Sequence, residues 1–142
     1  MKKKKSTADL MESLTQSHDL QLFMDENESD FQREDIADYL QALLKEKHLK
    51  KSRVIQDAML NEAYGYQIFS GAKTPRRDKV LCLALAMGLT LEETQKMLRA
   101  CGFSPLYVRH RRDCVFIHSI LEKKSVMEVN AVLDEMGLPL CV

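Results

Sequence analysis

The fold is decided by residues 52–71, which read SRVIQDAMLNEAYGYQIFSG. Ser52 is a natural N-cap residue for a first short helix with an apolar face. Asn61 is a natural cap for a second helix, and Gly71 suits the left-handed position that follows a helix end. This stretch therefore predicts two short helices on either side of a tight turn at residues 59–61.

Two helices joined by a tight turn make a helix-turn-helix, whose second helix projects into the major groove of DNA. The first helix is expected at Ser52–Ala58 and the second, the recognition helix, at Glu62–Phe69. Gly65 costs the second helix ~1 kcal/mol of helix propensity relative to alanine. Gln67 is the obvious reader of a base edge, since glutamine pairs with adenine and this helix carries no Lys or Arg.

Residues around this stretch occupy positions typical of one family. Ile36–Leu44 matches the first helix, and Ile68 matches the buried aliphatic residue late in the recognition helix. Gly71 matches the glycine after that helix, and Lys73 matches the basic residue of the following loop. Pro75 matches the proline before the fourth helix, and Gly88-Leu89 matches the turn that ends the fourth helix. In these positions the sequence resembles the Cro/λ-repressor-like (XRE-type) helix-turn-helix family. The resemblance implies a DNA-binding fold, although Phe69-Ser70 replaces the glutamate that usually precedes the glycine.

A wider resemblance covers most of the chain. The run Tyr66–Gly71, followed by Pro75, Arg77, Asp78 and Lys79, is similar to a group of poorly characterised helix-turn-helix proteins of Gram-positive anaerobes. This resemblance implies a bacterial or phage protein and brings no settled function with it.

The rest of the chain also favours helices, with only 5 Gly and 3 Pro in 142 residues and no strand pattern. Thr7 opens a first short helix and Ser17 can cap a second. Thr90 and Ser125 begin capping boxes, and Ser104-Pro105 is expected to start a helix that runs to about residue 123. The sequence thus predicts an all-α protein of seven to nine helices, with a λ-repressor-like core and helical extensions at both ends.

Three segments are expected. Residues 1–30 form an acidic N-terminal helical extension with a basic tail, residues 31–102 form the helix-turn-helix core, and residues 103–142 form a C-terminal helical hairpin packed on the core. The net charge of zero conceals a strong asymmetry between segments. Residues 6–46 hold 11 acidic and 2 basic side chains, whereas residues 47–112 hold 13 basic and 5 acidic ones. Such a basic segment indicates a polyanionic partner, unless the two segments simply pair with each other or with solvent.

The expected DNA-binding residues are the polar and aromatic side chains of the recognition helix, with Ala63, and the basic residues on both sides of it. They are Lys50, Lys51, Ser52, Arg53, Asn61, Glu62, Ala63, Tyr64, Tyr66, Gln67, Lys73, Arg76 and Arg77. Because the recognition helix itself carries no cation, its flanking Lys and Arg residues must supply the phosphate contacts that give affinity.

The sequence therefore predicts a transcriptional regulator that binds double-stranded DNA with full or partial sequence specificity. A homodimer is expected, because a small domain gains specificity from two half-sites. The alternative is a protein–protein adaptor or inhibitor that uses the helix-turn-helix as a docking platform, to which Glu62 and the tyrosines are also suited. An acidic N-terminal segment that competes with DNA for the basic region is a further hypothesis.

Other function classes find little support. The sequence has no nucleophile–base motif and no phosphate-binding glycine loop, so we expect no enzyme and no cofactor. His110, Cys114 and His118 have metal-ligand chemistry, but their outer members would lie ~12 Å apart on one helix, so no metal site is expected. Asp113 is expected to pair with an arginine. Four scattered cysteines, no signal peptide and no membrane span favour reduced thiols in a cytoplasmic protein.

Overall fold

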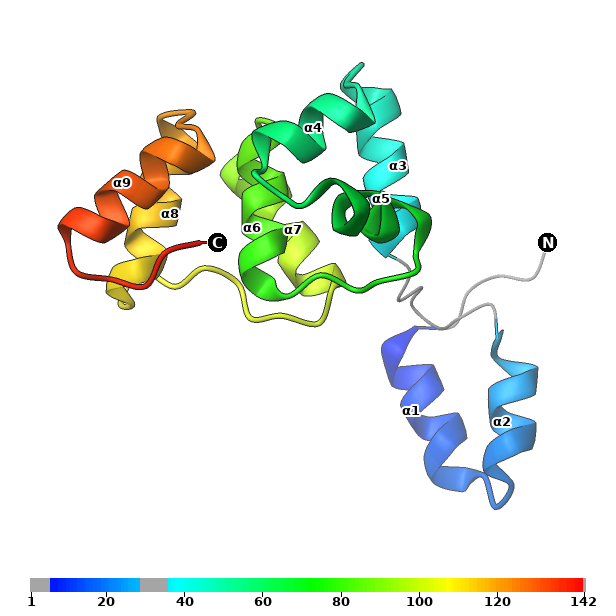
Figure 1. The fold of residues 1–142 in the computed structure, drawn as a ribbon. Coiled ribbons are helices and arrows are strands. Elements are labelled where there is room, and N and C mark those ends of the chain that lie inside the picture. Colours follow the sequence, from blue (N-terminus) through cyan, green and yellow to red (C-terminus); the bar gives the residue numbers. More distant parts are fainter. Residues whose placement is uncertain (1–5, 29–35, 142) are drawn as a thin grey trace. The chain divides into compact units, whose positions relative to one another are not determined.

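The computed structural model describes residues 6–28 and 36–141. Within these residues the protein is all-α, with nine helices and no strand (Figure 1). The chain divides into two compact units, Met1–Arg33 and Glu34–Val142.

The N-terminal unit contains α1 (Thr7–Gln16) and α2 (Leu20–Glu26). Asp19, not Ser17, caps α2, because its carboxylate accepts a hydrogen bond from the Leu22 amide at 3.1 Å. The Ser17 hydroxyl is instead bonded to the backbone of Asp19, and the Ser17 amide ends α1. The expectation that Ser17 caps the second helix was therefore wrong, since a carboxylate two residues later takes the capping position.

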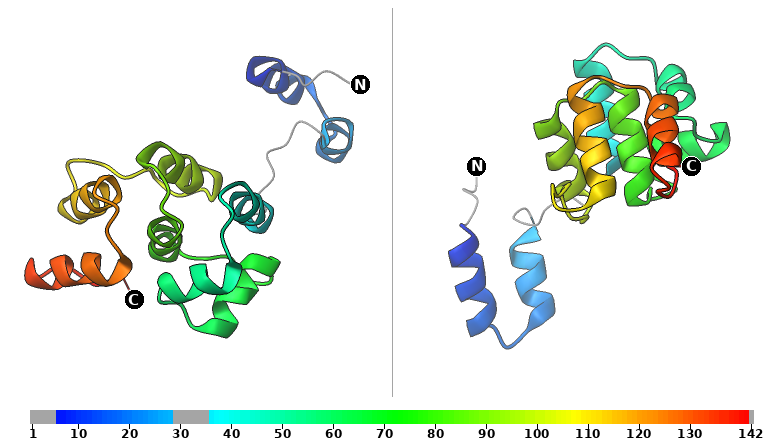
Figure 2. Two further views of the ribbon diagram at one scale, coloured as in Figure 1. Left: turned by 90° about the horizontal axis from the view of Figure 1, so that it is seen from above. Right: turned by 90° about the vertical axis from the view of Figure 1, so that its left-hand side faces the viewer.

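The C-terminal unit holds the remaining helices of the described chain. They are α3 (Ile36–Glu46), α4 (Lys51–Asp57), α5 (Glu62–Ser70), α6 (Arg77–Ala86), α7 (Leu91–Ala100), α8 (Arg111–Leu121) and α9 (Val126–Glu135). Helix α6 packs against α4, α7 and α9, and Figure 2 shows it among these helices. Its six consecutive residues 80–85 are all buried, as expected of a helix covered on every side.

One hydrophobic core extends through this unit. Leu40 of α3 and Ile68 of α5 belong to the same buried cluster as Phe116 of α8 and Leu133 of α9. Helices α8 and α9 also pack against each other. The C-terminal helices are therefore continuous with the packing that holds α4 and α5.

Six helices of this unit end in the same way, with a left-handed residue whose successor donates a backbone hydrogen bond to the carbonyl five residues earlier. Glycine occupies this position after α6, α7 and α9, at Gly88, Gly102 and Gly137. The other three left-handed residues are His48, Met59 and Lys123, after α3, α4 and α8. Glycine thus identified only half of these helix ends from sequence.

The N-cap residue of α4 lies two residues earlier than expected. Lys50 is its N-cap residue, without a side-chain capping bond, and the Lys50 carbonyl accepts from the Val54 amide at 3.0 Å. Ser52 therefore lies inside the helix, where its hydroxyl is exposed, and the expectation that it is the N-cap was wrong.

The expected helix start at Ser104-Pro105 was also wrong, because α8 begins at Arg111 with His110 as its N-cap residue. The carbonyls of Ser104 and Pro105 accept hydrogen bonds from Arg77 at 3.1 and 3.3 Å. The Gln95 side chain binds both the amide and the carbonyl of Leu106. Side chains from α6 and α7 thus take the backbone groups that a helix would need for itself.

Candidate nucleic-acid interface

Helices α4 and α5 are joined by residues 58–61 and pack directly on each other. Met59 adopts a left-handed conformation in this connection, and the Leu60 amide bonds back to the Ile55 carbonyl. Asn61 then caps α5, since its side-chain oxygen accepts from the Tyr64 amide at 3.2 Å. Gly65 faces Ile55 where the two helices approach, so the absence of a side chain permits the contact.

Helix α5 has one buried and one exposed face. Gly65, Ile68 and Phe69 are buried, and the Phe69 carbonyl accepts from the Gln41 amide group of α3 at 3.0 Å. Tyr64 is half-buried, packed against the core. The exposed side chains of this helix are Glu62, Ala63, Tyr66, Gln67 and Ser70. Anchoring on one side thus presents a small, mostly polar surface on the other.

Basic residues adjoin α5 in the chain on both sides, although they differ in availability. Lys50, Lys73 and Arg76 are exposed. Arg53 is also exposed, with an ion pair to Asp57 one turn later at 3.3 Å that solvent weakens. Lys51 is half-buried, with its ammonium group 5.8 Å from the centre of the Phe69 ring. We define the flanking cations as Lys50, Arg53, Lys73 and Arg76.

Arg77 does not belong with these flanking cations. Its guanidinium makes two hydrogen bonds to the Asp113 carboxylate, both at 3.2 Å, and also binds the carbonyls of Ser104 and Pro105. The expected pairing of Asp113 with an arginine is confirmed. Arg77 uses its donors to hold the segment before α8, so we assign it a structural role and leave it out of the candidate interface.

Asp113 remains ionised in spite of its burial. Desolvation alone would raise its pKa, but hydrogen bonds from Arg77 and from the Tyr107 amide, with the attraction of the Arg77 charge, together lower the pKa below 3.8. The Tyr107 amide lies 3.0 Å from the carboxylate. The buried charge therefore holds α6, the 103–110 segment and α8 together.

Gln56 was not singled out from the sequence. It is exposed on α4 and, with Ser52, Glu62 and Tyr66, lines a hollow of about 320 Å³ between α4 and α5. Gln56 lies four residues after Ser52, and this spacing on one face of a helix is the signal that could have identified it. The hollow adds an amide and a hydroxyl beside the exposed face of α5.

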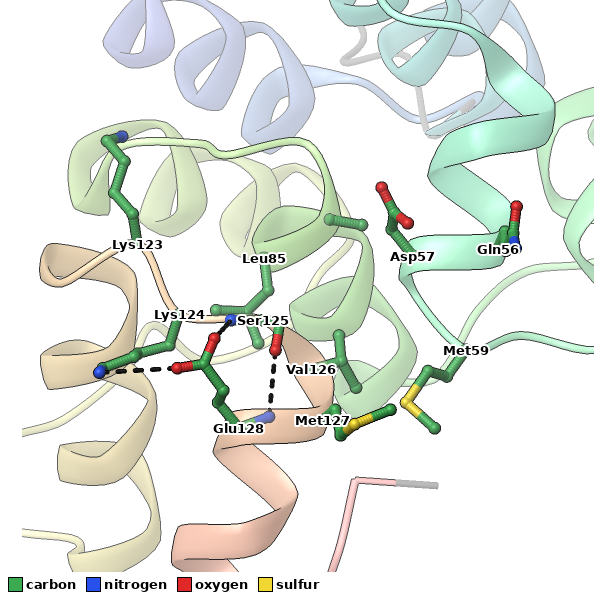
Figure 3. A pocket seen from close by; sticks show the side chains of 11 residues that line it. Gln56, Asp57, Met59, Leu85, Lys123, Lys124, Ser125, Val126, Met127 and Glu128 are labelled. Atoms are coloured by element: carbon green, nitrogen blue, oxygen red, sulfur yellow. Dashed lines mark hydrogen bonds and ion pairs between the residues drawn. The ribbon is translucent and has the colours of Figure 1, made fainter.

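A second hollow of about 530 Å³ lies where the α4–α5 connection meets the end of α6 and the start of α9 (Figure 3). Met59 of the α4–α5 connection and Met127 of α9 both line it, together with Leu85 of α6 and Val126 of α9. Glu128 at its rim is occupied by the Ser125 capping box and by an ion pair with Lys124 at 3.6 Å. Nothing in this lining supplies an activated nucleophile or base.

No metal-binding cluster of three or more His, Cys, Asp or Glu side chains occurs among residues 6–28 and 36–141. His110 is the N-cap residue of α8 and not part of the helix, so the expected row of His110, Cys114 and His118 along a single helix does not form. None of the helices in the described residues has the length and apolar character needed to cross a membrane.

Comparisons with protein-family models, with curated proteins and with solved structures find no match for this sequence.

Proposed function

We propose that α3–α7 form a helix-turn-helix domain of the Cro/λ-repressor type and that the protein is a regulator that binds double-stranded DNA. The observation that carries this proposal is the exposed face of α5, which has exposed cations before it, at Lys50 and Arg53, and after it, at Lys73 and Arg76. A groove-reading helix needs cations that contact the phosphates beside it, and these exposed cations precede and follow α5 in the chain.

In this proposal α5 enters the major groove. Gln67 pairs with an adenine edge, and Glu62 accepts from a cytosine amino group. Asn61, Ala63 and Tyr66 line the approach, while the exposed hydroxyl of Ser52 and the amide of Gln56 on α4 contact the phosphate backbone. Tyr64 packs against the core, and the Lys51 ammonium group lies near the Phe69 ring on the buried face of α5.

Affinity in this proposal comes from the flanking cations. Each neutralised phosphate contributes about 0.9 to the slope of log affinity against log salt, so four contacts give a slope of roughly 3–4. Because α5 carries no Lys or Arg, the salt dependence of affinity measures the contribution of the flanking cations. A homodimer would place two such helices on successive major grooves, at half-sites about 34–36 Å apart.

The test is a salt titration of binding to duplexes selected from genomic fragments. Replacing Lys73 and Arg76 by alanine should lower the salt slope by about 2, since two phosphate contacts are lost. The matched control replaces Lys96 and Arg99, two exposed cations on α7, and should leave the slope unchanged.

Failure to retain any duplex at about 50 mM salt, where phosphate contacts are still strong, would contradict the proposal. That result, together with the co-purification of a protein that binds the exposed face of α5, would favour the adaptor function instead. Substitution of Tyr66 and Gln67 would then abolish protein capture, whereas loss of Lys73 and Arg76 would matter little.

A further inference from the structure

The C-terminal residues 138–141, which we call the C-terminal strap, lie along helices of the same unit. Arg112 of α8 donates to the carbonyls of Pro139 and Leu140 at 2.9 and 3.2 Å. The same guanidinium makes two short bonds to the Asp78 carboxylate of α6, at 2.7 and 2.9 Å. A single arginine thus connects α6, α8 and the strap.

The end of the strap is held even more closely. The Cys141 amide donates to the Asn130 side chain of α9 at 2.7 Å, and the Cys141 sulfur lies 3.3 Å from the Asp78 carbonyl oxygen. These contacts bring the Cys141 sulfur to 2.7 Å from the sulfur of Cys82 on α6. Both cysteines are buried, with exposed fractions of 0% for Cys82 and 1% for Cys141.

We propose that Cys82 and Cys141 are the site of a reversible disulfide that fixes the C-terminal strap to α6 when the protein meets a hydroperoxide. The proposal does not depend on DNA binding, because it rests on the strap and its anchors alone. The two sulfurs are separated by 59 positions in sequence, so only the tertiary fold brings them together.

The sulfur separation favours a covalent bond over a shared metal ion. An S–S bond measures about 2.05 Å, so a small movement of the strap joins the two atoms. Two thiolates on one tetrahedral zinc ion, with bonds of about 2.3 Å, would lie about 3.8 Å apart. The sulfurs at 2.7 Å leave no room for such an ion between them.

The two thiols are also unequal, as a stepwise oxidation requires. The hydrogen bond from Cys141 is the largest effect on the Cys82 thiol and lowers its pKa against the effect of burial, with help from the charges of Lys79 and Arg112. The same bond raises the pKa of Cys141. This direction favours Cys82 as the attacking thiol and Cys141 as the resolving thiol.

The chemistry balances with the hydroperoxide as oxidant. The Cys82 thiolate attacks the terminal oxygen, the O–O bond breaks, and an alcohol (or water, from hydrogen peroxide) leaves with the Cys82 proton. Cys141 then attacks the resulting sulfenic acid, an S–S bond forms, and the hydroxide leaves as water with the Cys141 proton. Two thiols and one hydroperoxide thus give one disulfide, one alcohol and one water. A hydroperoxide reaches the buried sulfurs during local openings of the strap, and the disulfide forms once Cys141 is again beside Cys82.

The test uses two full-length proteins from which the other two cysteines have been removed. The Cys101→Ser/Cys114→Ser variant keeps only the proposed pair, and the matched control carries Cys141→Ser in addition. Each protein is treated with hydrogen peroxide, its free thiols are counted, and a proteolytic digest is analysed by mass spectrometry with and without a reductant.

The expected result is loss of both thiols in the first protein, a cross-linked peptide pair containing Cys82 and Cys141, and recovery of both thiols after reduction. Closing so long a loop should raise the melting temperature by roughly 5–15 °C, and the Cys141→Ser control should show no such rise. The outcome that overturns the proposal is a monomeric protein with both thiols still free, or with Cys82 oxidised to sulfinic acid while Cys141 stays reduced. Retention of zinc by the untreated protein, lost on Cys141→Ser, would also overturn it.

Discussion

Gly65 of α5 lies so close to Ile55 of α4 that a Cβ atom built on the glycine would be 2.5 Å from Cγ2 of Ile55 and 2.9 Å from its Cγ1. Both atoms are attached directly to the β-carbon of a branched side chain, which has little freedom to move aside. The glycine that weakens α5 as an isolated helix is therefore the residue that allows α4 and α5 to pack. Local propensity has been given up for a tertiary contact.

Replacing Gly65 by alanine should destabilise the protein. The steric cost of overpacking, about 1–3 kcal/mol or more, exceeds the gain in helix propensity of about 1 kcal/mol, so we expect a net loss of about 1–2 kcal/mol in the free energy of unfolding. Urea denaturation followed by circular dichroism measures it. In an Ile55→Ala background, where the clash is absent, the same substitution should become stabilising.

Ala63→Gly is the matched control for this prediction, because Ala63 is exposed on the same helix and should lose about 1 kcal/mol through propensity alone. If Gly65→Ala stabilised the wild-type protein as much as the Ile55→Ala variant, the close approach of α4 and α5 would not be what requires glycine.

Met59 should respond in the opposite sense. It holds a left-handed φ of 59° between α4 and α5, and its side chain is 49% exposed, so little packing is lost with it. Met59→Gly should stabilise the protein by about 1 kcal/mol in thermal denaturation, because glycine adopts this conformation without steric strain.

Gly88→Ala tests the same backbone argument from the other direction. Gly88 has a φ of 64°, and a Cβ built on it would meet no atom within 4 Å, so strain alone should destabilise this variant by about 1 kcal/mol. If wild type and Met59→Gly were equally stable while Gly88→Ala had a clearly lower free energy of unfolding, the strain at Met59 would be relieved by a change of the α4–α5 turn in solution.

Sequence reasoning succeeded where the chemistry was local. The caps at Asn61, Thr90 and Ser125 and the left-handed Gly71 are all present, because each depends on groups within a few residues. The same reasoning missed the left-handed His48, Met59 and Lys123, since no glycine marks them. Leu49 and Leu60, which follow His48 and Met59, pack against the hydrophobic core, and a single sequence does not display this packing.

The candidate site could be predicted only in part, for a similar reason. Asn61, Gln67 and the flanking cations are neighbours in sequence, and the cap at Asn61 and the exposure of Gln67 agree with what local patterns predict. Arg77 was grouped with them because it follows Arg76, yet its partners lie 27 to 36 positions away. The non-local bonds of Arg77 also explain why Ser104-Pro105 starts no helix. Local sequence patterns therefore do not predict which side chains form long-range ion pairs.

The Arg77–Asp113 pair should make stability depend on pH. The pKa of Asp113 is lower in the folded protein than its ordinary value of 3.8, so its contribution is complete above that value and is lost as the pH falls through the folded-state pKa. Asp113→Asn should cost about 2–4 kcal/mol at pH 7, because Arg77 then remains half-buried without its counter-charge. Unfolding curves at a series of pH values measure both effects.

The difference between wild type and Asp113→Asn should narrow as the pH falls from 4 through the folded-state pKa of Asp113, below which both side chains are neutral. Asp57→Asn is the control, since Asp57 is paired with Arg53 on the surface and should change stability by at most about 1 kcal/mol. A difference that stayed constant across this range would show that Asp113 acts through shape and not through its charge.

In the proposed DNA-binding function, base recognition by Gln67 and phosphate attraction by the flanking cations contribute separately to affinity. Gln67 is exposed on α5, and its side chain is free to form two hydrogen bonds with an adenine edge. Gln67→Ala should weaken binding to the best selected duplex by about 1–3 kcal/mol while leaving the salt slope unchanged, because no phosphate contact is removed. Fluorescence anisotropy on the selected duplex and on one with the adenine replaced measures the change, and the variant should no longer distinguish the two.

Gln16→Ala removes the same amide from α1 and should leave both affinities as they were. If Gln67→Ala instead weakened binding to both duplexes equally, α5 would contact the DNA without reading it, and specificity would have to come from the shape of the duplex.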